Sequence, residues 1–120
     1  MTNPSNSFLD LTQGVTVRPG TLRSGAPDVM KSFGSLGRAA MVDGVLSAKT
    51  KELMALALGV AARCDPCMVY HVQALVKLGA SRQELDETLG VVVYMGGGPA
   101  LMYAANAIAA FDEFSREAPT

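Results

Sequence analysis

Ten consecutive residues, Leu53 to Ala62, carry no polar side chain, and this run constrains the fold more than any other feature of the chain. Ser47, three residues before Thr50, is a plausible N-cap for a helix that contains the run and continues to about Ala62. A helix that is apolar on every side has to be buried, either within one subunit or between subunits. We therefore expect other helices, of this subunit or of a neighbouring one, to cover it.

The chain that follows this run is divided by helix start and stop signals. Asp65 is a preferred N-cap and Pro66 suits the first helical position, so a helix is predicted from Pro66 to Leu78. Gly79 is typical of the residue that follows a helix end. Ser81 and the glutamate three residues later form a capping box, which opens the next helix.

Two further helices complete the predicted fold. Apolar residues recur at helical spacing over residues 26–41, and Pro99 can open a last helix that extends to Phe114. No segment shows the sustained alternation of apolar and polar residues that is typical of a half-buried strand. The sequence thus predicts a compact all-α fold of five or so helices. We expect an irregular N-terminal arm over residues 1–25, where glycines and prolines follow no period, and a single all-α domain over residues 26–120.

The composition favours a homo-oligomer and argues against a nucleic-acid partner. Apolar residues make up 49% of the chain and charged residues only 18%, which leaves more apolar surface than one small subunit is expected to cover. We therefore expect a homo-oligomer, in which helices of different subunits pack on each other. The net charge is −1 and the basic residues are scattered, so no nucleic-acid partner is expected.

The 20 residues from Val91 to Ala110 carry no charge and are long enough to span a membrane. The glycines and proline of Gly96–Pro99 interrupt the centre of this stretch, which favours a pair of buried helices, and no membrane association is expected. The N-terminus lacks a basic segment followed by an apolar one, the pattern of a signal peptide. We therefore expect a cytoplasmic protein in a reducing compartment.

Both cysteines and the only histidine lie within eight residues, from Cys64 to His71. Cys67 and His71 are four residues apart and share a face of the predicted helix, while Cys64 lies just before its first turn. A helix N-terminus lowers the pKa of a nearby thiol, and Arg63 adds a positive charge that the carboxylate of Asp65 opposes. The pattern favours a redox-active dithiol, in which one thiolate attacks and the other resolves by forming the disulfide.

Three other interpretations of this cluster stay open. Two cysteines and a histidine supply three ligands of a zinc site, and Glu52 or another subunit could supply a fourth. A purely structural disulfide is less attractive, because closing so short a loop removes little chain entropy. The cysteines and His71 could also be ordinary core residues.

Glu52 is the last charged residue before the apolar run and lies 12 residues before Cys64. If the turn after Cys64 makes the flanking helices antiparallel, a rise of about 1.5 Å per residue brings Glu52 and His71 to within roughly 8 Å along the helix axes. Two side chains or one water molecule can close such a gap, and a carboxylate there would orient the imidazole ring. Taken alone, Glu52 could equally be an ordinary carboxylate in a first helical turn.

The chain resembles the core of the alkylhydroperoxidase AhpD, within the carboxymuconolactone decarboxylase-like family, in the combined spacing of Glu52, Cys64, Cys67 and His71. The resemblance covers roughly residues 48–114. It implies an all-helical fold that assembles as a dimer, trimer or hexamer. It also implies that Cys67 is the thiol that attacks a hydroperoxide. Cys64 would be the resolving thiol, which forms the disulfide with Cys67. Glu52 and His71 would then form a proton relay.

The activity implied by this resemblance is that of a thiol-dependent oxidoreductase, a peroxidase that reduces hydroperoxides through a Cys64–Cys67 disulfide cycle. No bound cofactor is required, but a separate dithiol or protein reductant has to reset the disulfide. AhpD proteins with peroxidase activity commonly have a histidine immediately before the second cysteine, where this chain has Pro66. The alternatives are a decarboxylase-type lyase or isomerase, which would use Glu52 and His71 for acid–base chemistry, and a non-enzymatic redox-sensing oligomer.

Overall fold

The computed structural model describes Phe8 and residues 19–117, and within them it contains six helices and no strand. The helices are α2 (Pro19–Gly25), α3 (Pro27–Met41), α4 (Ala48–Ala61), α5 (Asp65–Lys77), α6 (Arg82–Gly96) and α7 (Gly98–Glu117). The predicted all-α fold is therefore confirmed, and the five predicted helices correspond to α3 to α7. The single domain over residues 26–120 stays a prediction.

The N-terminal segment differs from the prediction of an irregular arm. Residues 19–25 form the short helix α2. Pro19 stands at its first position, where the fixed φ of proline suits a helix and the missing N–H leaves no donor unpaired. The remainder of the predicted arm, apart from Phe8, lies outside the described residues.

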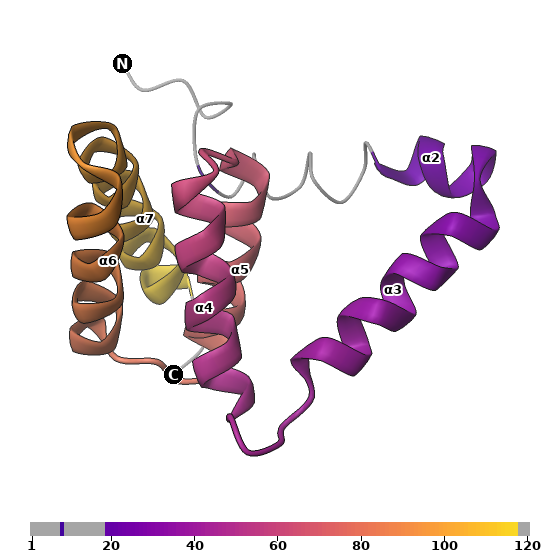
Figure 1. Cartoon of the computed structure of the whole chain (residues 1–120), viewed down its shortest axis with the longest axis horizontal. Helices are drawn as coiled ribbons and strands as arrows, with labels where there is room; N and C mark the ends of the chain where they lie inside the picture. Colours follow the sequence, from indigo (N-terminus) through magenta and orange to yellow (C-terminus); the bar gives the residue numbers. More distant parts are fainter. Residues whose placement is uncertain (1–7, 9–18, 118–120) are drawn as a thin grey trace.

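Helices α4 to α7 form one packed group, and α3 leads away from it to one side (Figure 1). The chain reverses direction between α4 and α5, which lie side by side (Figure 1). Helix α7 packs against both α5 and α6, and α4 contacts all three of the other helices in the group. This arrangement places the turn between α4 and α5 beside α7.

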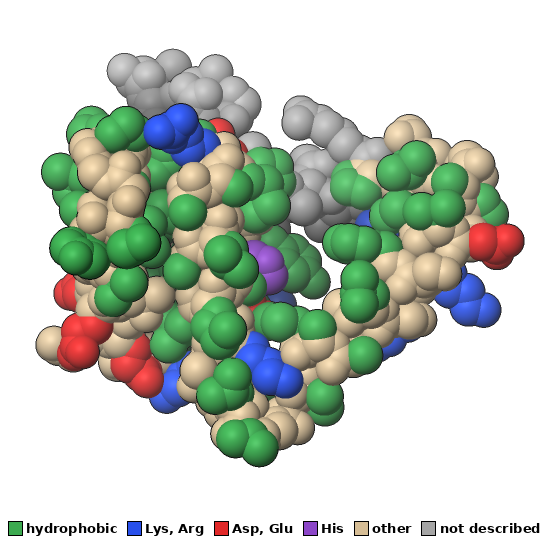
Figure 2. All heavy atoms as spheres, viewed as in Figure 1, with side chains coloured by type: hydrophobic (Ala, Val, Ile, Leu, Met, Phe, Trp, Pro, Cys, Tyr) green, Lys and Arg blue, Asp and Glu red, His purple; other side chains and the backbone are tan. Residues whose placement is uncertain are grey.

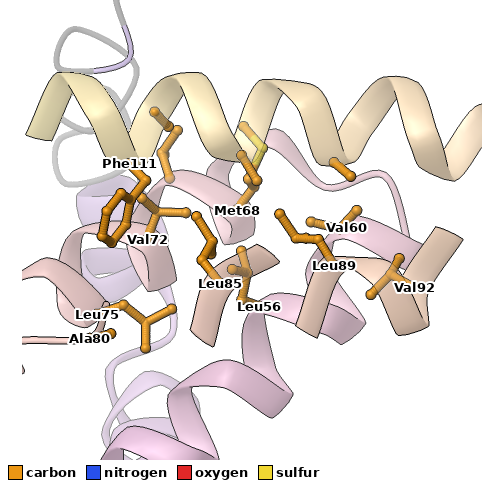
Figure 3. Packing of buried hydrophobic residues seen from close by; sticks show 14 of the residues in the cluster. Leu56, Val60, Met68, Val72, Leu75, Ala80, Leu85, Leu89, Val92 and Phe111 are labelled. Atoms are coloured by element: carbon orange, nitrogen blue, oxygen red, sulfur yellow. The ribbon is translucent and has the colours of Figure 1, made fainter. Parts of the chain in front are cut away.

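The core is built from the facing sides of these four helices (Figure 3). Its largest fully buried side chains are Leu56, Val60, Met68, Val69, Val72, Leu75 and Leu85. The apolar run of α4 is only partly covered within the subunit, because Leu56 and Val60 are fully buried while Leu58 is 71% exposed. One side of α4 therefore faces outward and carries apolar side chains.

Local signals end and begin most helices as predicted. The side chain of Ser47 accepts a hydrogen bond from the backbone N–H of Thr50, and Ser81 forms a complete capping box with Glu84. Gly79 follows α5 with a left-handed φ of 77°. The uncharged stretch from Val91 to Ala110 is divided between α6 and α7. Among the helices described, none is both long enough and apolar enough to cross a membrane.

Candidate redox site

The turn that carries the first cysteine is a Schellman motif at the end of α4. The backbone N–H of Arg63 donates to the carbonyl of Val60 at 3.0 Å, and that of Cys64 donates to the carbonyl of Gly59 at 3.0 Å. Arg63 has a φ of 56°, which makes it the one non-glycine residue with a left-handed backbone in the described part of the chain. The chain thus leaves α4 sharply and enters α5 two residues later.

Helix α5 begins one residue earlier than predicted. Its N-cap is Cys64 and not Asp65, because Cys64 has an extended backbone and its sulfur accepts a hydrogen bond from the N–H of Cys67 at 3.2 Å. Asp65 is the first helical residue, where the helix dipole favours a carboxylate, and Pro66 is the second. Both cysteines therefore belong to the first turn of α5.

Cys64 and Cys67 are joined by a disulfide, with their Cα atoms 5.2 Å apart. Cys67 is exposed and Cys64 is partly buried. Helix α4 approaches this pair closely at Gly59, where an added Cβ atom would lie 3.1 Å from the Cβ of Cys67. The disulfide is thus held against α4 on one side and open to solvent at Cys67.

Glu52 and His71 lie in direct contact across α4 and α5. A carboxylate oxygen of Glu52, Oε2, lies 2.7 Å from Nδ1 of His71, and the two side chains are 13% and 23% exposed. An ionised carboxylate only accepts, so Nδ1 carries the proton in this contact, and in the neutral imidazole Nε2 is then the acceptor. Figure 2 shows the imidazole of the single histidine at the surface, on the side toward α3.

The structure brings the four residues singled out from the sequence to one region. His71 lies one turn after Cys67 on the same face of α5, a spacing that places Cβ atoms roughly 5–6 Å apart. The rings of Tyr70 and His71 pack edge to face, with their centroids 5.3 Å apart. The arrangement can transfer protons near a thiol, because a carboxylate-held imidazole lies one helical turn from the exposed cysteine.

The zinc interpretation finds no support in the part of the chain that the structure describes. Within it, no group of three histidine, cysteine, aspartate or glutamate side chains is placed to hold a metal ion. Both sulfur atoms are instead bonded to each other.

Two residues at the site were missed by the sequence analysis. Gly59 permits the close approach of α4 to Cys67. Tyr103, from α7, donates a hydrogen bond from its hydroxyl to the carbonyl of Arg63 at 3.2 Å. A glycine inside an otherwise apolar helix was a signal that could have pointed to close packing, but no sequence signal connects Tyr103 to a residue 40 positions earlier.

Comparison with known proteins identifies the family of this chain. The family model described as the carboxymuconolactone decarboxylase family matches residues 27–110, which is more than half of the chain. The chain belongs to this family. The predicted family resemblance is thereby confirmed.

Solved structures of the carboxymuconolactone decarboxylase family share the fold in detail. A family protein from Legionella pneumophila is 54% identical, with a TM-score of 0.87 over 90% of this chain and 96% of its own. A family protein from Thermotoga maritima is 30% identical, with a TM-score of 0.78 over 90% of this chain and 91% of its own. The Thermotoga protein is described with a suggested involvement in antioxidative response.

Two curated relatives have similar sequences. An uncharacterised protein from Cupriavidus necator is 42% identical over 93 residues, which are 78% of this chain and 82% of the relative. A protein of the cox locus of Paracoccus denitrificans is 32% identical over 93 residues, which are 78% of this chain and 83% of the relative.

Proposed function

We propose that this chain is a thiol-dependent peroxidase of the AhpD type, which reduces hydroperoxides through a Cys64–Cys67 disulfide cycle. The observation that carries the proposal is the cysteine pair in its disulfide form, in the first turn of α5 and within one helical turn of the Glu52–His71 contact. The suggested antioxidative role of the Thermotoga relative is in keeping with it.

The proposed cycle has three steps. The thiolate of Cys67 attacks the hydroperoxide ROOH, the O–O bond breaks, and the products are the alcohol ROH and a sulfenic acid on Cys67. The thiol of Cys64 condenses with this sulfenic acid, which forms the disulfide and releases water. A separate dithiol then reduces the disulfide by exchange and is itself oxidised.

The protons of this cycle need a carrier near the cysteines. His71 takes the proton of the attacking thiol through Nε2, since Nδ1 is held by Glu52, and returns it to the leaving alkoxide. Cys67 is assigned the attack because it is exposed, whereas Cys64 is partly buried.

Pro66 limits the expected activity. Its side chain can neither donate nor accept a proton at the position where peroxidases of the AhpD group commonly have a histidine. We therefore expect turnover that is slower or more selective among hydroperoxides than in those enzymes.

A second candidate is a decarboxylase-type lyase or isomerase, which the family name and the Glu52–His71 contact favour. This reaction would leave the cysteines without a chemical role. Alkylation of both thiols separates the two candidates, because it abolishes a peroxidase and spares acid–base chemistry on a small acid.

The proposal is tested by peroxide consumption of the prereduced protein, with Cys64→Ser and Cys67→Ser as matched variants. With an added dithiol, the wild type should consume an organic hydroperoxide continuously. Without it, the Cys64→Ser variant should consume about one equivalent per subunit, because the sulfenic acid forms but is not resolved. The Cys67→Ser variant should consume none. A wild type that consumes no hydroperoxide at all would refute the peroxidase proposal, and the reverse behaviour of the variants would exchange the two thiol roles.

A further inference from the structure

We propose that Tyr103 is a positioning residue for the cysteine pair. Its hydroxyl holds the left-handed turn at Arg63 in the conformation from which Cys64 and Cys67 close their disulfide. The inference rests on the proposed dithiol chemistry and adds to it a residue from α7 that acts through the backbone of Arg63.

The turn needs support because Arg63 occupies a position that suits glycine. A left-handed backbone is strained for a residue with a Cβ atom, and such strain persists only where the surrounding structure holds it. The same Schellman motif recurs at the end of α5, with a hydrogen bond of 3.1 Å from the N–H of Gly79 to the carbonyl of Val76. There the left-handed residue is glycine, with a φ of 77°. At Arg63 the chain has the strained version of the same turn.

The support at Arg63 comes from another helix. The hydroxyl of Tyr103 donates to the carbonyl oxygen of Arg63 at 3.2 Å. Burial raises the pKa of Tyr103, and so does the carboxylate of Asp65, a second acceptor for the proton of this hydroxyl, while the charge of Arg63 lowers it in part. Because the net shift is upward from an ordinary value of 10.0, the phenol keeps its proton over the range where thiols titrate. Tyr103 therefore stays a hydrogen-bond donor over this pH range.

This hydrogen bond acts directly on the peptide that precedes the cysteine. The carbonyl of Arg63 and the N–H of Cys64 belong to one rigid peptide unit, so holding one orients the other. In the reduced protein, an unsupported Arg63 can relax out of its left-handed conformation and carry Cys64 away from Cys67. Support by Tyr103 keeps the two sulfurs close and so favours closure of the disulfide.

The test is the thiol–disulfide equilibrium of the full-length protein with dithiothreitol, measured by trapping free thiols and counting them by mass. A typical hydrogen bond changes an equilibrium constant by roughly two- to tenfold. We expect Tyr103→Phe to lower the constant for closing the Cys64–Cys67 disulfide by about fivefold. Tyr94→Phe is the matched control, since Tyr94 is 84% exposed on α6, and it should leave the constant unchanged.

A second variant tests the strain at Arg63. Arg63→Gly removes the Cβ atom that makes the turn unfavourable, so the turn needs less support. In this background, Tyr103→Phe should change the constant by less than twofold. An undiminished effect of Tyr103→Phe in the Arg63→Gly background would overturn the proposed mechanism.

Two further outcomes bear on the inference. A Tyr103→Phe protein with a lower melting temperature but an unchanged equilibrium constant would show a merely structural role, and the inference would be wrong. A shifted constant in a protein that consumes no hydroperoxide would uphold the role of Tyr103 and refute only the peroxidase proposal.

Discussion

At the scale of single residues, the site depends on a few contacts that hold reactive groups in place. The carboxylate of Glu52 holds Nδ1 of His71 at 2.7 Å, which orients the ring and leaves its other nitrogen free for proton transfer. Gly59 lies so close to Cys67 that an added Cβ atom would be in a tight contact of 3.1 Å with the Cβ of Cys67. The two contacts lead to different predictions, because the Glu52–His71 contact concerns proton transfer and the Gly59–Cys67 contact concerns packing.

Replacing His71 with alanine should slow thiol chemistry more than it weakens the fold. We expect peroxide turnover to fall by about a hundredfold, the usual scale for loss of a general acid–base group. The alkylation rate of the reduced protein, followed against pH, should also fall near neutral pH. Glu52→Gln serves as a comparison variant, because its amide oxygen can still accept a hydrogen bond from Nδ1 of His71. If the alkylation profile of the His71→Ala variant matches that of the wild type, His71 is a core residue without a role at the thiols.

Gly59→Ala should destabilise the protein, although alanine is the better helix former. The new methyl group would lie 3.1 Å from the Cβ of Cys67, and overpacking of this kind costs about 1–3 kcal/mol. Gly90→Ala is the matched control in α6, because nothing lies within 4 Å of its added Cβ atom. We expect it to stabilise the fold by up to about 1 kcal/mol. Urea unfolding of both variants measures the difference, and equal stabilisation by the two substitutions would contradict the close packing at Cys67.

At the scale of helices, side-chain hydrogen bonds to the backbone mark the starts of α4, α5 and α6. Helix α6 has the most complete example, in which the side chain of Ser81 accepts from the N–H of Glu84 and Glu84 accepts from the N–H of Ser81. Lys49 of α4 also contacts Glu84 at 2.8 Å, so this helix start is connected to a neighbouring element.

Ser81→Ala should lower the free energy of unfolding by about 1 kcal/mol, the typical cost of losing an N-cap. Ser115→Ala, at an exposed position of α7, serves as the control and should have little effect or a slightly stabilising one. Denaturant unfolding gives both values. Equal effects of the two substitutions would mean that the cap does not stabilise α6.

Glu84 makes the same helix start dependent on pH. Hydrogen bonding with Lys49 and with the backbone N–H of Ser81 lowers the pKa of Glu84 below its ordinary value of 4.5. A carboxylate with a lowered pKa contributes stability above that ordinary value and loses it as the pH falls through its folded pKa. Glu84→Gln should therefore be less stable than the wild type at pH 7, with the difference shrinking below about pH 4.5. A difference that stays constant from pH 7 to pH 3 would exclude this electrostatic contribution.

At the scale of the whole molecule, much apolar surface is left uncovered. Helix α3 extends from the packed group and has green apolar side chains along its length (Figures 1 and 2). Phe33 on this helix is 68% exposed, and Leu58 on α4 is exposed to a similar degree. Large exposed apolar surfaces of this kind mark interaction sites, and the apolar composition of the chain is in keeping with that.

We predict a stable homo-oligomer, with α3 packed on another subunit. Light scattering at micromolar concentration should give a multiple of the 12.5 kDa subunit mass. Phe33→Gln should shift the protein toward smaller species, whereas Lys31→Gln, on the opposite side of α3 by helical spacing, should not. A monomer as the only species of the wild type would contradict this prediction.

The helical class and most helix boundaries could be predicted from local residue patterns. Caps such as Ser47 and Ser81, and the left-handed Gly79, act on backbone groups within one turn of themselves. These signals need no knowledge of the rest of the chain. The same holds for the spacing of Cys67 and His71, because residues four apart share a face in any α-helix. The start of α5 was misplaced by one residue because the sulfur of Cys64 forms the cap, which the residue types alone did not indicate.

The contacts that hold the reactive groups depend on how the helices pack together. The contact of Glu52 with His71 requires α4 and α5 to lie antiparallel at the right height, which the spacing could suggest but not establish. The hydrogen bond from Tyr103 to Arg63 joins residues 40 positions apart and depends on where α7 packs. Contacts between distant segments depend on the combined packing of all four helices, so no local pattern encodes them.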